Sequence, residues 1–160
     1  MRRLLEAITL IELMVLVWIT FQALNGPHPL PPQVPTHFAA NGQANAWGPS
    51  SSLWILPAIA AGIYGLMTVV SLFPGSFNFP VRVTPLNRPR LEQLALGMIA
   101  WLKAELACLF LWIQVSIVRS VRSGQAEFPT WIMPVFLVVV FGTVAGHIAA
   151  MVRAGRRRSA

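Results

Sequence analysis

Residues 91–118 read LEQLALGMIAWLKAELACLFLWIQVSIV, and this long, mostly apolar run decides the fold class. A helix needs about 20 such residues in a row to cross the roughly 30 Å hydrocarbon core of a bilayer. Three further segments meet the same requirement, namely residues 4–24, 53–73 and 130–152. The whole chain is 56% hydrophobic and only 11% charged, whereas soluble domains carry about 25% charged residues. We therefore predict an all-α membrane protein, an antiparallel four-transmembrane-helix bundle, in which residues 1–160 form a single domain.

The net charge of +7 comes from basic residues that cluster between and beyond the predicted spans. The chain start, the connection 74–90 and the chain end hold most of them: Arg2, Arg3, Arg82, Arg88, Arg90, Arg153, Arg156, Arg157 and Arg158. The connection 25–52 has no Arg or Lys, and cytoplasmic segments are the ones enriched in these residues. We therefore predict a bacterial inner-membrane protein with both termini cytoplasmic. We expect no nucleic-acid partner, because the charges form no folded basic face.

The first span follows two arginines, as a signal peptide would, but Glu6 and Glu12 interrupt its apolar stretch. No clear cleavage site of small residues follows it. We therefore predict that this helix is retained.

The extracytoplasmic loop, residues 25–52, reads NGPHPLPPQVPTHFAANGQANAWGPSSS. Its prolines exclude helix from the first half. Residues 34–38 favour an extended segment, and residues 40–43 form a turn signal. We predict a short β-hairpin, and the alternative is a disordered loop, which the same composition fits. His28 and His37 have no carboxylate or cysteine beside them, so we predict structural hydrogen bonding for them rather than a metal site.

The connection between the second and third spans contains two signals for a helix start. Thr84 followed by Pro85 resembles an N-cap with proline at the first helical position. Asn87 is the alternative cap, and Pro89 would kink a helix that began before it. From Pro85 to about Ser120, at about 1.5 Å per residue, the third helix exceeds the thickness of a bilayer core. We therefore predict that its first turns project into the cytoplasm.

Ionisable residues at membrane depth are costly and are candidates for function. They form the predicted intramembrane polar cluster: Glu12, Lys103, Glu105 and His147. Lys103 and Glu105 point to nearly opposite faces of one helix and cannot pair well. We therefore predict that Lys103 pairs with Glu12, and that His147 faces Glu12 or Glu6. The cluster is either an interhelical ion pair that only fixes packing, which we favour, or a proton or ion path.

Small and aromatic residues predict how the helices pack. Close helix approach is predicted at five small residues: Ala58, Gly62, Gly65, Gly142 and Gly146. Cys108 is predicted to be a small buried core residue. Trp101 is predicted to pack between helices, whereas the outer interface is predicted to hold Trp18, Trp54, Trp112 and Trp131.

Two stretches resemble a known bacterial family. The first is PQVPTHF at residues 32–38, followed by NG at 41–42 and WG at 47–48. The second is FNFPVRVT at residues 77–84, followed by NR at 87–88 and WLKAE at 101–105. Together they are similar to the domain-of-unknown-function family 1648, over about residues 30–114. Ala39 or Ala40 stands where this family usually has Asn, and Pro85 and Leu86 replace a usual acidic pair.

The resemblance implies two sets of site residues. The first is a family-motif loop of Pro35, His37, Phe38, Asn41, Gly42, Trp47 and Gly48. The second is a cytoplasmic motif of Asn78, Pro80, Arg82, Thr84, Asn87 and Arg88.

The same domain forms the amino-terminal part of immunity proteins against the sporulation-delaying toxin, which also signal by sequestering a repressor at the membrane. The resemblance therefore implies a non-enzymatic sensor or immunity-like protein, with a peptide ligand outside and a protein partner inside. The alternatives are a small ion- or proton-coupled carrier component, built on the polar cluster, and a structural accessory subunit of a membrane complex or homo-oligomer. No nucleophile–base pair or phosphate-binding loop occurs in the sequence. We therefore expect no catalytic residue, no metal and no cofactor.

Overall fold

The computed structural model describes residues 1–125 and 127–156, so Arg157 and Arg158 of the charge argument lie outside the described residues. Most of the described chain is helical. The helices are α1 (Arg2–Asn25), α2 (Ile55–Ser71), α3 (Arg88–Ser123) and α4 (Ile132–Arg156). With the 3-10 turn η1 (Ser50–Trp54) added to α2, all four are long and apolar enough to cross a membrane. The four predicted spans are confirmed as helices, which fits a multi-pass membrane protein.

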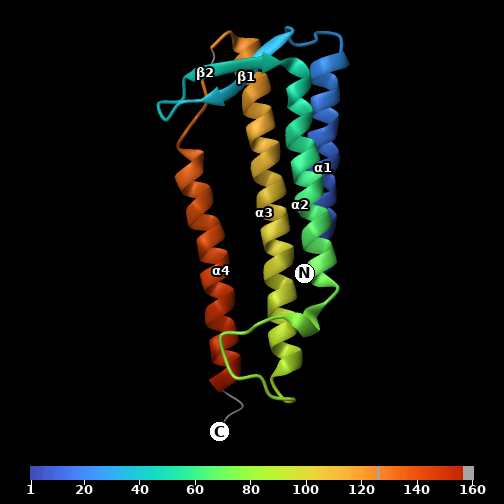
Figure 1. Cartoon of the computed structure of the whole chain (residues 1–160), viewed down its shortest axis with the longest axis vertical. Coiled ribbons are helices and arrows are strands. Elements are labelled where there is room, and N and C mark those ends of the chain that lie inside the picture. The colour runs from blue at the N-terminus through green and yellow to red at the C-terminus, as the bar shows by residue number, and fades with distance from the viewer. Residues whose placement is uncertain (126, 157–160) are drawn as a thin grey trace.

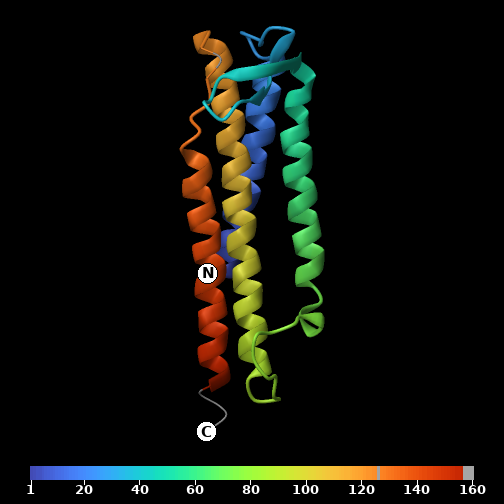
Figure 2. The same cartoon turned by 60° about the vertical axis from the view of Figure 1, so that its left-hand side comes forward.

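The central helix of the molecule is α3. It packs against α1, α2 and α4, and its contact with α1 is the most extensive. The helices α1 and α2 also touch, whereas α4 packs mainly on α3, on the side away from α2 (Figures 1 and 2). One cavity is lined by residues of α1, α3 and α4, and another is lined by residues of α2, α3 and α4 together with the loop before α3. Residues of α3 thus line both grooves.

Alanines allow the close packing of α3. Its buried face carries Ala95, Ala100, Ala104 and Ala107, and Leu5 of α1 packs against two of them. Small side chains at helix contacts let two backbones approach closely, which favours association in a bilayer.

The glycines that we expected at these contacts lie elsewhere. A Cβ atom added to any of four glycines would have no neighbouring atom of the described chain within 4 Å. These glycines are Gly62, Gly65, Gly142 and Gly146. Ala58 is also exposed. The predicted small-residue contact is therefore wrong within this chain, because hydropathy locates a span without telling which side of it faces a neighbour.

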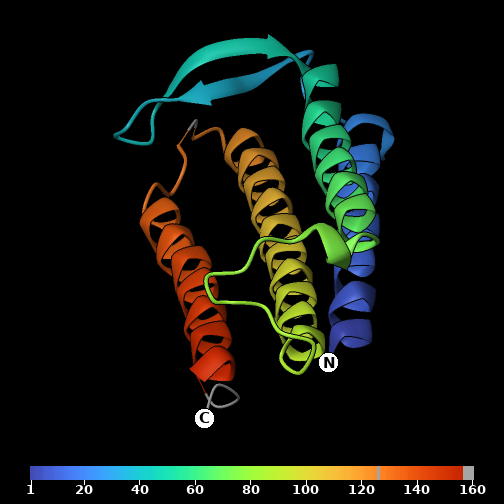
Figure 3. The same cartoon turned by 60° about the horizontal axis from the view of Figure 1, so that its bottom comes forward.

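The loop between α1 and α2 forms the expected hairpin. Strand β1 (Gln33–Phe38) pairs antiparallel with β2 (Ala44–Pro49), and the register is irregular around His37. The turn uses Gly42, whose φ of 85° lies in the left-handed region that favours glycine. The hairpin arches across the ends of the helices, with its turn above the start of α4 (Figure 3). We call this end of the molecule the hairpin end.

The hairpin is attached to the helices through an apolar cluster at this end. Val34 of β1 and Leu53 of η1 pack with Ala23 of α1 and with Ile117 and Val118 of α3. Val34 is fully buried. Because one β-strand face is anchored in the helical core, the loop is ordered, and the alternative of a disordered loop is wrong.

The opposite end holds the loop 72–87, including the 3-10 turn η2 (Pro74–Ser76). Val81 packs closely against Gly155 of α4. A Cβ atom added to Gly155 would lie only 2.9 Å from the Cβ atom of Val81. Leu91 and Met151 form the local core, with Phe77 and Phe79 packed against it. The loop therefore links the ends of α3 and α4. We call this end the basic end, after its exposed residues Arg82, Arg88, Arg90, Arg153 and Arg156.

The start of α3 corrects the prediction that the helix begins near Pro85. The helix begins at Arg88 with Asn87 at the N-cap position, as the alternative placed it, but the Asn87 side chain makes no capping hydrogen bond. The Asn87 carbonyl already accepts the Leu91 amide at 3.1 Å. Pro89 therefore falls in the first turn, where its missing N–H needs no partner. With 36 residues, α3 is about 54 Å long at 1.5 Å per residue, and it extends beyond the ends of α1 and α2 (Figure 1).

Candidate functional site

A cavity of about 570 Å³ lies beneath the hairpin, between α2, α3 and the start of α4. Its roof is β1 and the turn, from Pro35 to Ala40, and its floor includes Ile113 and Ile117 of α3. Leu53 and Leu56 line the α2 side, and Met133 lines the α4 side. We call it the hairpin cavity. Most of its lining is apolar, and among the residues that the structure describes His37 is the lining residue with an ionisable side chain.

Three residues of the predicted loop motif line the hairpin cavity, and the others shape the hairpin above it. Pro35, His37 and Phe38 are lining residues. Asn41 accepts the Gln43 amide through its side chain at 3.1 Å and so closes the turn at Gly42. Gly48 lies against the Thr36 side chain on the paired strand, whereas Trp47 is exposed. The motif therefore builds and roofs one apolar cavity.

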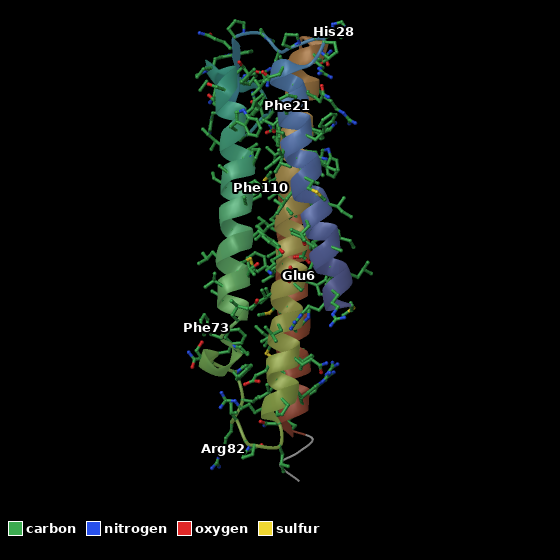
Figure 4. The ribbon with its side chains drawn as sticks, turned by 90° about the vertical axis from the view of Figure 1, so that its right-hand side faces the viewer. Glu6, Phe21, His28, Phe73, Arg82 and Phe110 are labelled. Atoms are coloured by element: carbon green, nitrogen blue, oxygen red, sulfur yellow. The ribbon has the colours of Figure 1, made fainter. Side chains whose placement is uncertain are left out.

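The histidines of this loop differ in their surroundings. His37 Nδ1 lies 2.5 Å from Asn45 Oδ1, across the hairpin. The predicted structural hydrogen bonding is therefore confirmed for His37. His28 lies at the hairpin end, away from the cavity lining (Figure 4).

The connection between α3 and α4 closes the cavity from the other side. The Phe128 amide donates to the Gly42 carbonyl at 2.7 Å. The Phe128 ring lies 5.2 Å from that of Phe38 and 5.3 Å from that of Trp112, centroid to centroid. Such aromatic pairs contribute about 0.5–1.5 kcal/mol beyond the area they bury. The hairpin is thus joined both to the helical core and to the segment that leads into α4.

Lys103 pairs with Glu6, not with Glu12 as predicted. Its Nζ lies 2.9 and 3.2 Å from the two Glu6 carboxylate oxygens and 2.9 Å from Thr68 Oγ1. It also lies 4.7 Å from the centroid of the Tyr64 ring, a cation–π distance, and the Tyr64 hydroxyl donates to Glu6. The side chain of Lys103 is 1% exposed and that of Glu6 is 30% exposed. This cluster joins α1, α2 and α3.

Lys103 meets Glu6 rather than Glu12 because α1 and α3 are shifted relative to each other along their helix axes. Because α3 begins farther toward the basic end, Leu5 of α1 packs level with Ala100 and Ala104. Glu6 is therefore level with Lys103, and Glu12 lies farther toward the hairpin end. Figure 4 shows Glu6 well inside the molecule, between His28 and Arg82 at its two ends.

The other members of the predicted polar cluster lie on the opposite side of α3. Glu105 accepts a hydrogen bond from the Thr143 hydroxyl of α4. His147 donates through Nδ1 to the Thr143 carbonyl at 2.9 Å. Its Nε2 points toward α3 and would lie 3.6 Å from a Cβ atom added to Gly97. The predicted approach of His147 to Glu12 or Glu6 is therefore wrong. The structure divides the predicted cluster between two faces of α3.

A second cavity, of about 400 Å³, lies in the groove between α1 and α4. Glu12 and Glu105 line it, and so do Trp101, Trp112 and Cys108. We call it the groove cavity. Cys108 is exposed rather than buried in the core, because this face of α3 forms the floor of the groove. Trp101, which we predicted to pack between helices, lines this cavity and is 37% exposed.

A buried polar residue that sequence reasoning missed is Gln114. It is fully buried, and its amide donates to Thr20 Oγ1 at 2.7 Å and to the Leu53 carbonyl at 3.3 Å. It joins α3 to α1 and to the start of α2. Its sequence signal is a polar amide within an apolar span, which is weaker than that of an ionisable residue because an amide carries no charge.

The motif at the basic end folds onto itself. The Asn87 side chain accepts the Thr84 amide at 2.8 Å and donates to the Arg82 carbonyl at 2.9 Å. Arg88 donates to the Gly75 carbonyl and pairs with Glu92 at 2.8 Å. Asn78 and Pro80 are exposed. These bonds fix the loop and leave the Arg82 side chain exposed.

The family comparison agrees with the loop motif. A family model described as a domain of unknown function, DUF1648, matches residues 10–61. This segment holds the later part of α1, the hairpin and the first part of α2, whereas the motif at residues 77–105 lies outside the match. No curated protein and no solved structure was found to match the chain. Over residues 10–61 the chain is therefore similar to the DUF1648 family, the family that its loop motif resembles.

Proposed function

We propose that this chain is a non-enzymatic, immunity-like membrane receptor that binds an apolar peptide segment in the hairpin cavity. The observation that carries the proposal is the cavity of about 570 Å³ roofed by the family-motif loop. An ordered loop that closes over a mostly apolar, preformed cavity is a common form of ligand site. The loop carries no charged ligand-binding residue, which favours an apolar ligand.

The free edge of β1 supports an extended peptide as the ligand. The described sheet has only two strands, so β1 pairs with β2 alone. The cavity is lined by β1 and by no residue of β2, so the unpaired side of β1 borders it. A peptide can add to such an edge through main-chain hydrogen bonds while its side chains enter the adjoining cavity. The main-chain hydrogen bonds to β1 would then supply affinity, and the contacts of the peptide side chains in the cavity would supply selectivity.

We further propose that the hairpin end faces the outside of a bacterial inner membrane and that both termini lie in the cytoplasm. Among the described residues, five exposed arginines lie at the other end of the molecule and two, Arg119 and Arg122, lie at the hairpin end, and this excess of positive charge is expected of a cytoplasmic face. Among the described residues there, Glu92 is the acidic side chain, and Arg88 neutralises it. The remaining arginines offer an acidic protein partner a basic surface on the loop 72–87 and the end of α4.

Two alternatives receive less support from the contacts. Lys103 is bonded to Glu6 and Thr68 and lies over the Tyr64 ring, as expected of an ion pair that fixes packing, although Lys103 and Glu6 also line a cavity of about 400 Å³. An accessory subunit would use the exposed face of α4 against another chain. That role gives no reason for a cavity roofed by the family motif.

A cavity-filling substitution tests the receptor proposal. Met133 lines the hairpin cavity on α4, and Met133→Trp would fill it without changing a residue of the hairpin. Leu137→Trp is the control, because Leu137 is exposed on the same helix and lines no described cavity. A strain that lacks the chain would be complemented with each form and challenged with linear apolar membrane-active peptides, with gramicidin A as the reference.

We expect the wild-type and Leu137→Trp forms to raise the inhibitory peptide concentration at least tenfold above that of the deletion strain. Met133→Trp should abolish this protection while the protein stays at the same level in the membrane. If the deletion strain is as resistant as the wild type to every peptide of the panel, the proposal is wrong.

A further inference from the structure

A cavity of about 400 Å³ lies between α1, α2 and α3, at the level where α1 begins and α2 ends. Arg2 and Arg3 line it from α1, Ser71 lines it from α2, and Lys103 lines it from α3. We call it the arginine cavity. Figure 4 shows α1 and α2 diverging toward this level, where Glu6 is labelled. The cavity is thus a space between helices that separate toward the basic end.

The charges that line the arginine cavity do not cancel. Glu6 supplies its negative charge, and the Lys103 ammonium bonds both oxygens of that carboxylate. The Tyr64 hydroxyl donates to Glu6 as well. The guanidinium groups of Arg2 and Arg3 have no ion pair or hydrogen bond with any described residue. Because Lys103 already compensates Glu6, two positive charges at the cavity remain without a counter-charge.

The length of α1 places these two arginines at the level of lipid headgroups. With 24 residues, α1 is about 36 Å long at 1.5 Å per residue, and the hydrocarbon core of a bilayer is about 30 Å thick. A helix that only slightly exceeds this thickness has its ends in the headgroup region. Guanidinium groups bind phosphate through paired hydrogen bonds. Arg2 and Arg3 therefore lie where the phosphate groups of phospholipids are found.

The rest of the cavity suits the apolar part of such a molecule. Ala7 and Leu10 of α1 line it together with Ile99 of α3. Leu10 lies about 10 Å from Arg3 along the helix axis, at 1.5 Å per residue, in the direction of the hairpin end. A phosphate group at the arginines would therefore continue into an acyl chain against apolar side chains. A free phosphate ion would leave this part of the cavity unused.

The two uncompensated charges favour a lipid with net negative charge. A zwitterionic lipid carries its own cation beside the phosphate, and that cation would be repelled by the arginines. Basic pockets between transmembrane helices are a known form of site for anionic headgroups.

We propose that the arginine cavity binds an anionic phospholipid, with Arg2 and Arg3 bonding its phosphate and with Leu10 and Ile99 contacting an acyl chain. The site shares no lining residue with the hairpin cavity. It therefore does not depend on the proposed receptor function, and it holds for either orientation of the chain in the membrane.

Two lipids with the same acyl chains and different headgroup charge test the site. Purified full-length chain in dodecyl maltoside would be titrated with dioleoylphosphatidylglycerol and, separately, with dioleoylphosphatidylcholine. Native mass spectrometry would count the lipids bound to each chain. We expect the first phosphatidylglycerol to bind with a Kd at least tenfold lower than that of phosphatidylcholine, and we expect added salt to reduce this difference, since salt screens exposed charges.

A charge variant assigns the preference to the two arginines. The double variant Arg2→Gln with Arg3→Gln should raise the Kd for phosphatidylglycerol at least tenfold, to that of phosphatidylcholine. The double variant Arg153→Gln with Arg156→Gln is the control, because both residues are exposed on α4 and line none of the cavities described. It loses the same charge and should bind like the wild type.

A shape variant assigns the binding to the cavity without changing any charge. Ala7→Trp would fill the cavity from α1 and should raise the Kd for phosphatidylglycerol at least tenfold. Leu4→Trp should leave it unchanged, because Leu4 is exposed on the same helix and lines none of the cavities described.

Comparison of the two lipids on the wild-type protein decides the matter even if a variant fails to fold. Equal Kd values for the two lipids would overturn the proposal, and so would an unchanged Kd in the folded arginine double variant. Glycerol phosphate, which carries the phosphate without acyl chains, should not displace phosphatidylglycerol at the same concentration. Displacement by glycerol phosphate would show that the site takes a soluble phosphate compound and that the lipid is the wrong ligand.

Discussion

At the scale of single residues, Lys103 shows how a charge is accommodated within the helices. Its ammonium group contacts two carboxylate oxygens, one hydroxyl and one aromatic ring, from two other helices. Removal of one partner from a buried ion pair typically costs about 3–5 kcal/mol, because the other charge is left uncompensated. The partial exposure of Glu6 places the expected cost toward the low end of this range.

We therefore expect Lys103→Met to destabilise the protein by about 3 kcal/mol. For a chain of this size, that corresponds to a fall in Tm of roughly 6–12 °C, measurable by intrinsic fluorescence in detergent. Arg88→Met is the control, because its side chain is 47% exposed and its pair with Glu92 is an i,i+4 surface pair. Such pairs contribute at most about 1 kcal/mol.

The double variant Lys103→Met with Glu6→Gln tests the pairing itself. If the two side chains are coupled, the double variant should be more stable than the sum of the single variants predicts, by at least about 1 kcal/mol. Additive losses would mean that Lys103 acts through packing alone.

At the scale of elements, the hairpin and the α3–α4 connection form one unit at Gly42. A side chain added to Gly42 would clash with the Phe128 carbonyl oxygen, and the φ of Gly42 is positive. Gly124 has a similar φ of 69° but open space around it. Comparison of alanine substitutions at the two glycines therefore distinguishes the effect of backbone strain from the effect of the contact between the hairpin and the α3–α4 connection.

We expect Gly124→Ala to cost about 1–2 kcal/mol, the strain of a left-handed conformation in a residue with a Cβ. Gly42→Ala should cost more, and amide exchange in β1 and β2 should accelerate, because the Phe128 amide would lose its acceptor. Hydrogen exchange with mass spectrometry measures this difference. Equal effects of the two substitutions on hairpin exchange would show that the Phe128 contact does not hold the hairpin.

At the scale of the whole molecule, the proposed orientation places the hairpin outside and the basic end inside. Single cysteines would be introduced at Ala46 of β2 and at Arg82 of the loop 72–87, both of which are exposed. The background would carry Cys108→Ser, because Cys108 is itself exposed in the groove. We expect a membrane-impermeant maleimide to label Ala46→Cys in intact cells, and to label Arg82→Cys only after permeabilisation. The opposite pattern would reverse the orientation.

The four helices, the hairpin and its turn followed from sequence because each depends on local physics. Span length follows from bilayer thickness, and the turn follows from Asn41 and Gly42, which accept left-handed or turn geometry readily. Of the two stretches that carried the DUF1648 resemblance, the one in this hairpin lies within the matched residues 10–61, and the one at residues 77–105 lies outside them. The start of α3 was left open between Thr84 and Asn87, because both residue types cap helices.

Tertiary structure alone decided which residues meet. The position of α3 relative to α1 pairs Lys103 with Glu6 instead of Glu12, and no local pattern encodes that relative position. In the tertiary structure the alanine face of α3 packs against neighbouring helices, whereas the glycines of α2 and α4 do not. Hydropathy reports that a helix is surrounded by apolar material without distinguishing lipid from protein. The sequence by itself therefore determined the spans and the hairpin, and packing decided the two cavities and which charges face them.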